Sequence, residues 1–154
     1  MTEITKYTQA LAEATLTHLR EAGARELECI VLWLGKRDNS GWTVEEAYRP
    51  EHSARLDQFT IPAVAMQALY AHLKSHRRML VAQVHSHPES AFHSRADDVG
   101  AIVRHVGALS IVLPHFALRT TAKSFVEDSA VFQLSPTNHW DDLTFAKRDL
   151  LRCF

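Results

Sequence analysis

Short apolar runs alternate along the chain with segments in which apolar residues recur every three or four positions. Residues 29–34, 79–84 and 108–113 are almost continuously apolar and end at turn-forming or polar residues. Runs of this length predict strands that are buried on both faces of a sheet. A further strand is expected within residues 42–48, and a less distinct pattern predicts another at residues 129–134.

Four segments have helical periodicity or helix-boundary residues. The first spans residues 4–22 and should end near Gly23, and the second begins at Pro62 and ends near Ser75. A third is expected to open at Ser94 and stop at Gly107, and a terminal helix is expected at about residues 141–152. Helices that alternate with buried strands predict an α/β fold, in which a sheet is covered by helices on both faces.

The length and composition indicate one folding unit. The chain has 154 residues, of which 46% are hydrophobic, and it contains no Pro-rich or Gly/Ser-rich linker and no internal repeat. We therefore expect residues 1–154 to form a single domain.

Charge and cysteine content exclude several classes of protein. Seventeen basic residues against eighteen acidic ones give a formal net charge of −1, which provides no basic field for nucleic acid or for a membrane surface. Cys29 and Cys153 are too few for a disulfide scaffold. Because the chain also shows no signal-peptide pattern and no run of ~18 apolar residues, we expect a cytoplasmic protein.

Ten histidines occur, and two of them have the spacing of metal ligands. His85 and His87 follow a buried strand and are two residues apart, so their imidazoles should point to the same side while Ser86 points away. Asp97 lies ten residues after His87, within a predicted helix. Two imidazoles and one carboxylate form a three-ligand set that leaves a fourth tetrahedral position for water.

Each part of this pattern has a simpler explanation when it is taken alone. A His-x-His sequence is often accidental, and Ser94-x-x-Asp97 is also the pattern of a helix capping box. Two other His-x-His chemistries are excluded. A metallo-β-lactamase-like site needs an Asp-His pair where this chain has Glu89 and Ser90, and an amidohydrolase barrel needs ~250 residues.

Taken together, the motifs resemble those of a known family. His85-Ser86-His87-Pro88 followed by Ser94-x-x-Asp97 is similar to the JAMM signature of the MPN-plus (JAB) zinc isopeptidases. The family also has a Glu on the first buried strand, and Glu28, seven residues before Gly35, resembles it. The resemblance implies an MPN (JAB, cytidine-deaminase-like) domain with a mixed β-sheet and a motif-bearing core at about residues 24–135.

The resemblance also implies roles for individual residues. His85, His87 and Asp97 would bind one zinc ion per chain. Glu28 would act as the general acid and base, and Ser94 would help to hold the water and the developing oxyanion. Two alternatives remain open. Glu26 lies on the same predicted strand face as Glu28, and Asp98 replaces Asp97 if the family spacing is counted from His87.

Bacterial stand-alone members of the family resemble enzymes encoded beside ubiquitin-like proteins and their E1- and E2-like partners, as in antiviral conjugation operons. We therefore expect a zinc-dependent, deubiquitinase-like isopeptidase that cleaves after the C-terminus of a ubiquitin-like modifier. The tail of the modifier is expected to pair as an added strand beside the strand that ends at His87. The alternatives are a peptidase that processes a sulfur-carrier protein, and a metal-free MPN scaffold that only binds partners.

Overall fold

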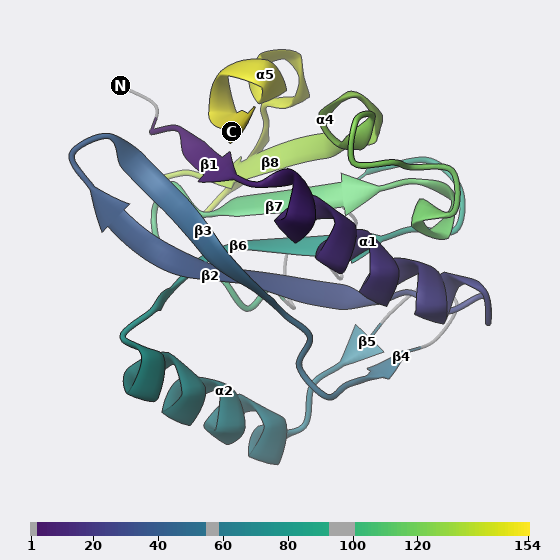
Figure 1. Cartoon of the computed structure of the whole chain (residues 1–154), viewed down its shortest axis with the longest axis horizontal. Helices are drawn as coiled ribbons and strands as arrows, with labels where there is room; N and C mark the ends of the chain where they lie inside the picture. The colour runs from purple at the N-terminus through teal and green to yellow at the C-terminus, as the bar shows by residue number, and fades with distance from the viewer. Residues whose placement is uncertain (1–2, 55–58, 93–100) are drawn as a thin grey trace.

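The three continuous apolar runs form neighbouring strands in the middle of one sheet. The structure, a computed structural model, describes residues 3–54, 59–92 and 101–154. In this part of the chain a mixed eight-stranded sheet has the order β10-β1-β3-β2-β6-β7-β8-β9 (Figure 1). Its strands are β1 (Thr5–Tyr7), β2 (Ile30–Asp38), β3 (Gly41–Tyr48), β6 (Met79–Ser86), β7 (Leu109–Leu113), β8 (Ala130–Leu134), β9 (Trp140–Asp142) and β10 (Leu151–Cys153).

The remaining elements are short except for two helices. Helices α1 (Gln9–Gly23) and α2 (Ala63–His76) flank the sheet. The smaller elements are the two-stranded sheet of β4 (Ser53–Ala54) and β5 (Phe59–Thr60), the helices α4 (Phe125–Asp128) and α5 (Lys147–Leu150), and the single turns η1 (His115–Ala117) and η2 (Thr144–Ala146).

The sheet is buried on both faces, as predicted. Val31 and Trp33 of β2 pack in one core cluster with the apolar residues of α1. Ile30 and Leu32 pack in a second cluster that includes Leu69 of α2. Because successive residues of a strand point to opposite faces, this division places α1 over one face and α2 over the other. The α/β fold with helices on both faces is therefore confirmed.

Helix α1 begins later than its sequence pattern predicts. The side chain of Thr8 caps the helix by accepting a hydrogen bond from the Leu11 N–H at 3.1 Å. The chain before this cap is extended and forms β1, which pairs in parallel with both β3 and β10. Helix α2 begins after Pro62 and ends at His76, within one residue of the predicted end.

Two predicted helices are wrong in the described residues. Residues 93–100 lie outside the described part of the chain, and residues 101–107 are not helical. The N–H groups of Ile102 and Val103 instead donate to Oε1 of the buried Gln83, at 3.0 and 3.4 Å. The terminal helix predicted at about residues 141–152 is reduced to α5, because the chain on either side of it joins the sheet as β9 and β10.

Gly35 is required where β2 bends against β3. The pairing of the two strands shifts register between Leu34 and Gly35, and a Cβ atom on Gly35 would lie 1.9 Å from the carbonyl oxygen of Thr43. Glycine therefore allows the close approach of the two backbones.

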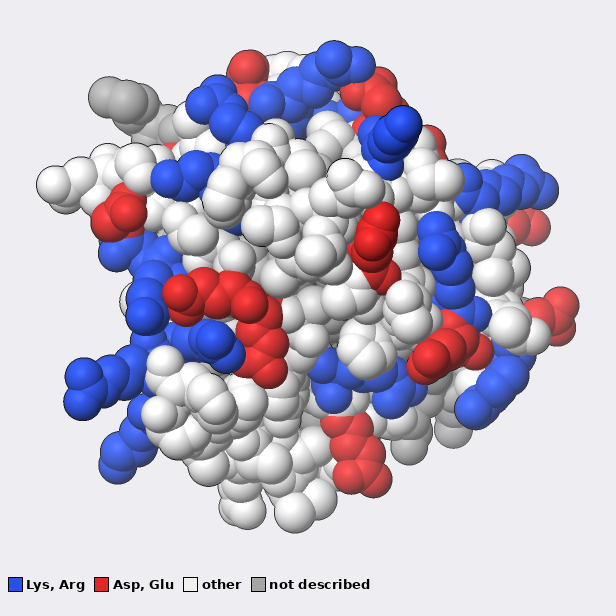
Figure 2. Space-filling view, viewed as in Figure 1, with Lys and Arg blue, Asp and Glu red and all other residues white. Residues whose placement is uncertain are grey.

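The surface agrees with the balanced charge of the sequence. Figure 2 shows basic and acidic side chains interspersed over one face of the molecule, without an extended basic area. None of the helices in the described residues has both the length and the apolar character needed to span a bilayer.

One buried hydrogen bond connects α1 to the sheet. Trp33 Nε1 donates to Thr15 Oγ1 at 2.9 Å, and the Thr15 hydroxyl donates to the carbonyl of Leu11 at 2.9 Å. Trp33 also stacks on Phe125, with 5.6 Å between ring centroids. The indole N–H thus has a polar partner within an otherwise apolar cluster.

We expect Thr15→Val to lower the free energy of unfolding by about 1–3 kcal/mol, because it leaves the indole N–H of Trp33 buried without an acceptor. Thr17→Val is the matched control, since the Thr17 hydroxyl is exposed and bonds only within its own helix. Urea denaturation of both variants measures the difference. Equal losses in the two variants would show that the Thr15–Trp33 bond contributes little.

Candidate functional site

The pairing of β2 with β6 brings the predicted site residues together. The two strands are antiparallel, with Ile30 opposite His85. One residue further, the Ser86 N–H donates to the Cys29 carbonyl and the Cys29 N–H donates to Ser86 Oγ, both at 3.2 Å. The next residues outward are Glu28 on one chain segment and His87 on the other.

Glu28, His85 and His87 form a buried polar cluster at this end of the sheet. Their exposed fractions are 1%, 0% and 3%. Glu28 Oε1 lies 3.5 Å from His87 Nε2, and the two imidazole rings are 5.1 Å apart between centroids. A carboxylate and two imidazoles are costly to bury unless they pair with one another or bind a metal, so the cluster is unlike an ordinary core.

Ser86 takes part in this arrangement, which sequence reasoning did not foresee. The sequence places it on the opposite side of the strand from His85 and His87, with no assigned role. In the structure its hydroxyl accepts the Cys29 N–H directly beside Glu28. The available signal in the sequence was a serine between two histidines at the end of a strand predicted to be buried.

The loop after β6 is held by the chain that follows β7. The His87 N–H donates to the Leu113 carbonyl at 2.9 Å, and the Phe116 N–H donates to the His87 carbonyl at 2.8 Å. His115 donates its N–H to the Glu89 carbonyl at 2.9 Å. The main chain around His87 is therefore bonded to a second segment of the fold.

That second segment has an unusual backbone. His115, Phe116 and Ala117 have φ angles of 54°, 53° and 60°. The left-handed region costs an L-residue roughly 1–2 kcal/mol, so three successive residues in it store strain beside the site. Sequence reasoning also missed this feature, because none of the three residues is glycine.

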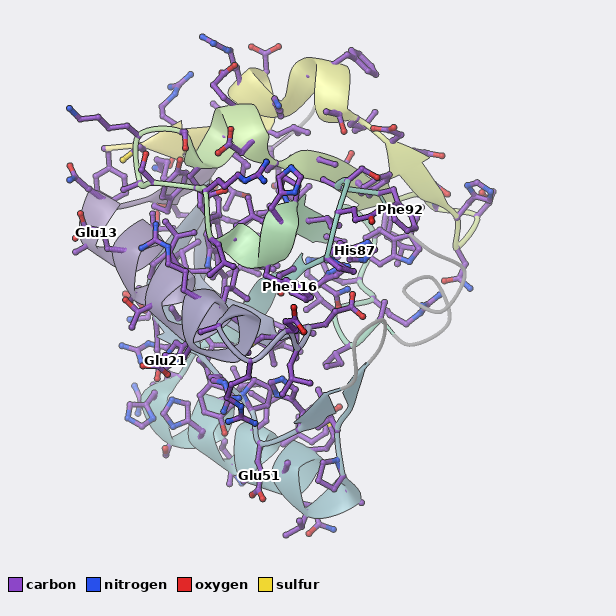
Figure 3. All side chains as sticks on the ribbon, turned by 90° about the vertical axis from the view of Figure 1, so that its right-hand side faces the viewer. Glu13, Glu21, Glu51, His87, Phe92 and Phe116 are labelled. Atoms are coloured by element: carbon purple, nitrogen blue, oxygen red, sulfur yellow. The ribbon has the colours of Figure 1, made fainter. Side chains whose placement is uncertain are left out.

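Phe92 is an exposed aromatic neighbour of the cluster. Its ring meets the His87 ring edge-on, with 4.5 Å between centroids, while 49% of its surface remains exposed. Figure 3 shows His87, Phe92 and Phe116 at this end of the molecule. The cluster is therefore in contact with an aromatic ring that is accessible at the surface of the described residues.

Gln83 connects β6 to the chain that follows residues 93–100. Besides its bonds to Ile102 and Val103, its amide nitrogen donates to Ser110 Oγ at 3.2 Å. Gln83 and His85 lie on the same face of β6. This side chain therefore anchors residues 102 and 103, which follow the segment that contains Asp97.

Cys29 is adjacent to Glu28, but its side chain packs in the apolar cluster on the α1 face of the sheet. Burial raises the pKa of the Cys29 thiol, and a hydrogen bond from the side chain of Arg49 opposes this shift. At neutral pH, Cys29 therefore remains protonated in the core.

The described residues contain part of the predicted ligand set. Ser94, Asp97 and the alternative Asp98 lie in residues 93–100, outside the described part of the chain. Among the described residues, no group of three His, Cys, Asp or Glu side chains is arranged to hold a metal. The structure brings together His85, His87 and Glu28, and it leaves Glu26 exposed in a turn with φ 58°.

The imidazoles of His85 and His87 fit a catalytic metal site whose third ligand comes from outside the described residues. Buried imidazoles are preferred ligands of zinc, and catalytic zinc has three protein ligands with one open position. A carboxylate next to one imidazole is placed to act on a water molecule at that open position. His85 and His87 are therefore the residues of the described chain that would hold the metal.

Comparison with known proteins gives similarities in sequence and in fold. Residues 8–128 match the family described as prokaryotic homologs of the JAB domain. The chain is 31% identical over 133 residues to "Probable metalloprotease y4jG" of Sinorhizobium fredii, with 84% of this chain and 80% of that protein covered.

A solved structure has a similar fold. The solution structure of protein DSY2949 from Desulfitobacterium hafniense covers 98% of this chain and 93% of its own, with a TM-score of 0.72 and 16% sequence identity. The family match spans both His85 and His87, as well as Glu28, and includes the four central strands β3, β2, β6 and β7. The chain belongs to the prokaryotic JAB domain family.

Proposed function

We propose that this protein is a metal-dependent peptidase, and more narrowly a zinc isopeptidase that cleaves after the C-terminus of a ubiquitin-like protein. The observation that carries the proposal is the 3.5 Å contact between Glu28 and His87 in a buried cluster that also contains His85. Family membership and the similarity to "Probable metalloprotease y4jG" support the peptidase activity.

In this proposal, His85, His87 and Asp97 hold one zinc ion. A bound zinc ion would polarise the scissile carbonyl and lower the pKa of a coordinated water to about 7. The antiparallel pairing of β2 and β6 fixes the backbone next to the two imidazoles. The Ile30–His85 pair is followed by two hydrogen bonds between Cys29 and Ser86. Backbone pairing of this kind would orient the two imidazoles before the metal binds.

Glu28 is the proposed general base and acid. It would take a proton from the attacking water and then deliver that proton to the leaving amine. Its burial suits this task, because a carboxylate shielded from bulk water exchanges its proton with the reactants rather than with solvent. Ser94 is proposed to stabilise the developing negative charge on the carbonyl oxygen.

The topology changes how the substrate tail is expected to bind. In the sheet, β6 lies between β2 and β7, and both of its edges are paired from Ala82 to Ser86, next to the histidine pair. An extended tail cannot therefore add to β6, contrary to the sequence-based expectation. We propose instead that the tail crosses the end of the sheet and packs on the exposed ring of Phe92.

The proposed partners are a ubiquitin-like modifier, its conjugates and the E1- and E2-like proteins of the same operon, with a role in antiviral defence. A sulfur-carrier protein has the same type of C-terminal amide, so both substrates belong in the assay. The retained Glu28, His85 and His87 argue against a metal-free scaffold, because a binding module needs none of these side chains in its core.

The purified protein should contain one zinc ion per chain, and the double variant His85→Ala/His87→Ala should contain none, because it removes both imidazole ligands. Elemental analysis of protein purified without chelators measures this. His139→Ala is the control, since that imidazole is exposed and far from the cluster in sequence. A wild-type chain free of tightly bound divalent metal contradicts the catalytic proposal.

Asp97→Ala should abolish zinc binding, whereas Asp98→Ala should retain it. Only Asp97 keeps the three-residue offset from Ser94 of the Ser-x-x-Asp motif. Zinc titration monitored with a competing chromophoric chelator compares the two variants directly. Loss of zinc in Asp98→Ala alone would show that the spacing from His87 determines the ligand.

Glu28→Gln should keep zinc bound and the fold intact while it lowers isopeptidase turnover by ~10²–10⁴. Glutamine has the size of glutamate but cannot accept a proton at neutral pH. Cleavage of linear and isopeptide-linked fusions of a ubiquitin-like protein, and of a sulfur-carrier protein, measures turnover and substrate class together.

Glu26→Gln is the matched control for this variant, because it makes the same chemical change on an exposed side chain two residues away. Zinc content and thermal melting of both variants separate a catalytic effect from a structural one. Near-normal cleavage by Glu28→Gln would remove Glu28 from the mechanism, and a selective loss in Glu26→Gln would assign the base to Glu26.

A further inference from the structure

The C-terminal end of α1 lies against the left-handed turn η1. A Cβ atom on Gly23 would lie 2.6 Å from both Cβ and the carbonyl oxygen of Phe116, so glycine is needed for this close approach. Arg20 reaches the same turn from one helical turn earlier. Its Nε donates to the Ala117 carbonyl at 3.3 Å, and its Nη2 donates to the Thr120 carbonyl.

The turn needs such support because of its backbone. Of the six non-glycine residues with positive φ in the described part of the chain, three are consecutive in η1, and the other three are isolated. Strained φ values persist where the surrounding structure leaves the chain no alternative. Here Arg20 and Gly23 of α1 supply contacts that hold the turn in its left-handed form.

The opposite side of the turn faces the loop that carries His87. The Phe116 N–H donates to the His87 carbonyl, and the His115 N–H donates to the Glu89 carbonyl. The φ angle of His115 sets the direction of the Phe116 N–H, so this amide points at the His87 carbonyl only while the turn remains left-handed. The turn therefore connects α1 to the backbone of a proposed metal ligand (Figure 3).

We propose that α1 positions His87 through this turn, and that Arg20, Gly23 and Phe116 are positioning residues of the metal site. None of the three lies in the motif that identifies the ligands. The inference depends on the proposed metal binding by His87 and is independent of the identity of the substrate.

The test compares metal affinity in variants of the full chain. Arg20→Gln removes the guanidinium that bonds to Ala117 and Thr120, and Gly23→Ala inserts a Cβ against Phe116. Each variant should bind zinc about 10- to 100-fold more weakly, as is typical when a residue that orients a ligand is lost. Substitution with Co²⁺ should also change the visible absorption bands, because these report ligand geometry.

Two controls match these changes. Arg25→Gln removes the same charge from an exposed side chain just beyond α1. Gly107→Ala adds a Cβ where no atom lies within 4 Å, at a φ of +88° before β7. This alanine is strained and should lower the melting temperature, but it should leave zinc affinity and the cobalt spectrum unchanged.

A rescue variant tests the role of the left-handed backbone itself. Ala117→Gly lowers the conformational cost of a positive φ at that position. In the Arg20→Gln background it should restore part of the lost zinc affinity, because the turn then depends less on the arginine. An effect on stability alone would not produce this recovery.

The outcomes separate this inference from the proposed function. If Arg20→Gln folds and binds zinc with wild-type affinity and an unchanged cobalt spectrum, the positioning role is wrong, even if the wild type cleaves its substrate. If the wild type binds zinc but cleaves none of the fusions, the isopeptidase proposal fails while the affinity comparison still decides the role of the turn. A wild type that binds no metal overturns both. If Gly23→Ala does not fold, Arg20→Gln carries the comparison.

Discussion

The register between β2 and β6 is the constraint on which the rest of the site depends. With Ile30 opposite His85, the residues just beyond the strand pair are Glu28 and His87, and their side chains come within 3.5 Å. A slip of one residue would turn every side chain of one strand to the other face of the sheet. The register is fixed because both faces of β2 are buried, so a slip would exchange the residues packed against α1 with those packed against α2.

The same burial that fixes the register makes the site unfavourable for folding stability. Two imidazoles and a carboxylate lie in a region that apolar side chains would otherwise fill, and three successive residues of η1 hold left-handed φ angles beside them. Polar burial and backbone strain both reduce stability. The large apolar clusters on the two faces of the sheet offset these costs, and Glu28, His85 and His87 lie at the end of the strands that contribute to both clusters.

The central strands and the His-x-His pair were predictable because they depend on local rules. Apolar runs identified β2, β6 and β7, and the period of two placed His85 and His87 on one side. The non-helical conformation of residues 102 and 103 was not predictable in this way. Their N–H groups bond to the side chain of Gln83, which lies 19 and 20 residues earlier in the chain. The C-terminal strands were missed for the same reason: β9 and β10 are short, and their stability comes from pairing with β8 and β1 rather than from their own sequences.

The period of two along β6 also explains why this strand can organise the site from its interior. Gln83 and His85 lie on one face, where Gln83 anchors the chain at Ile102 and Val103. Ser86 belongs to the other face, and its hydroxyl bonds to the Cys29 N–H beside Glu28. Three residues within four positions of one strand thus carry an anchor for the segment after Asp97, a proposed metal ligand, and a hydrogen bond to the residue that follows the proposed base. From Ala82 to Ser86 both edges of β6 are paired, and that pairing leaves no free edge there for a substrate tail to join as an added strand.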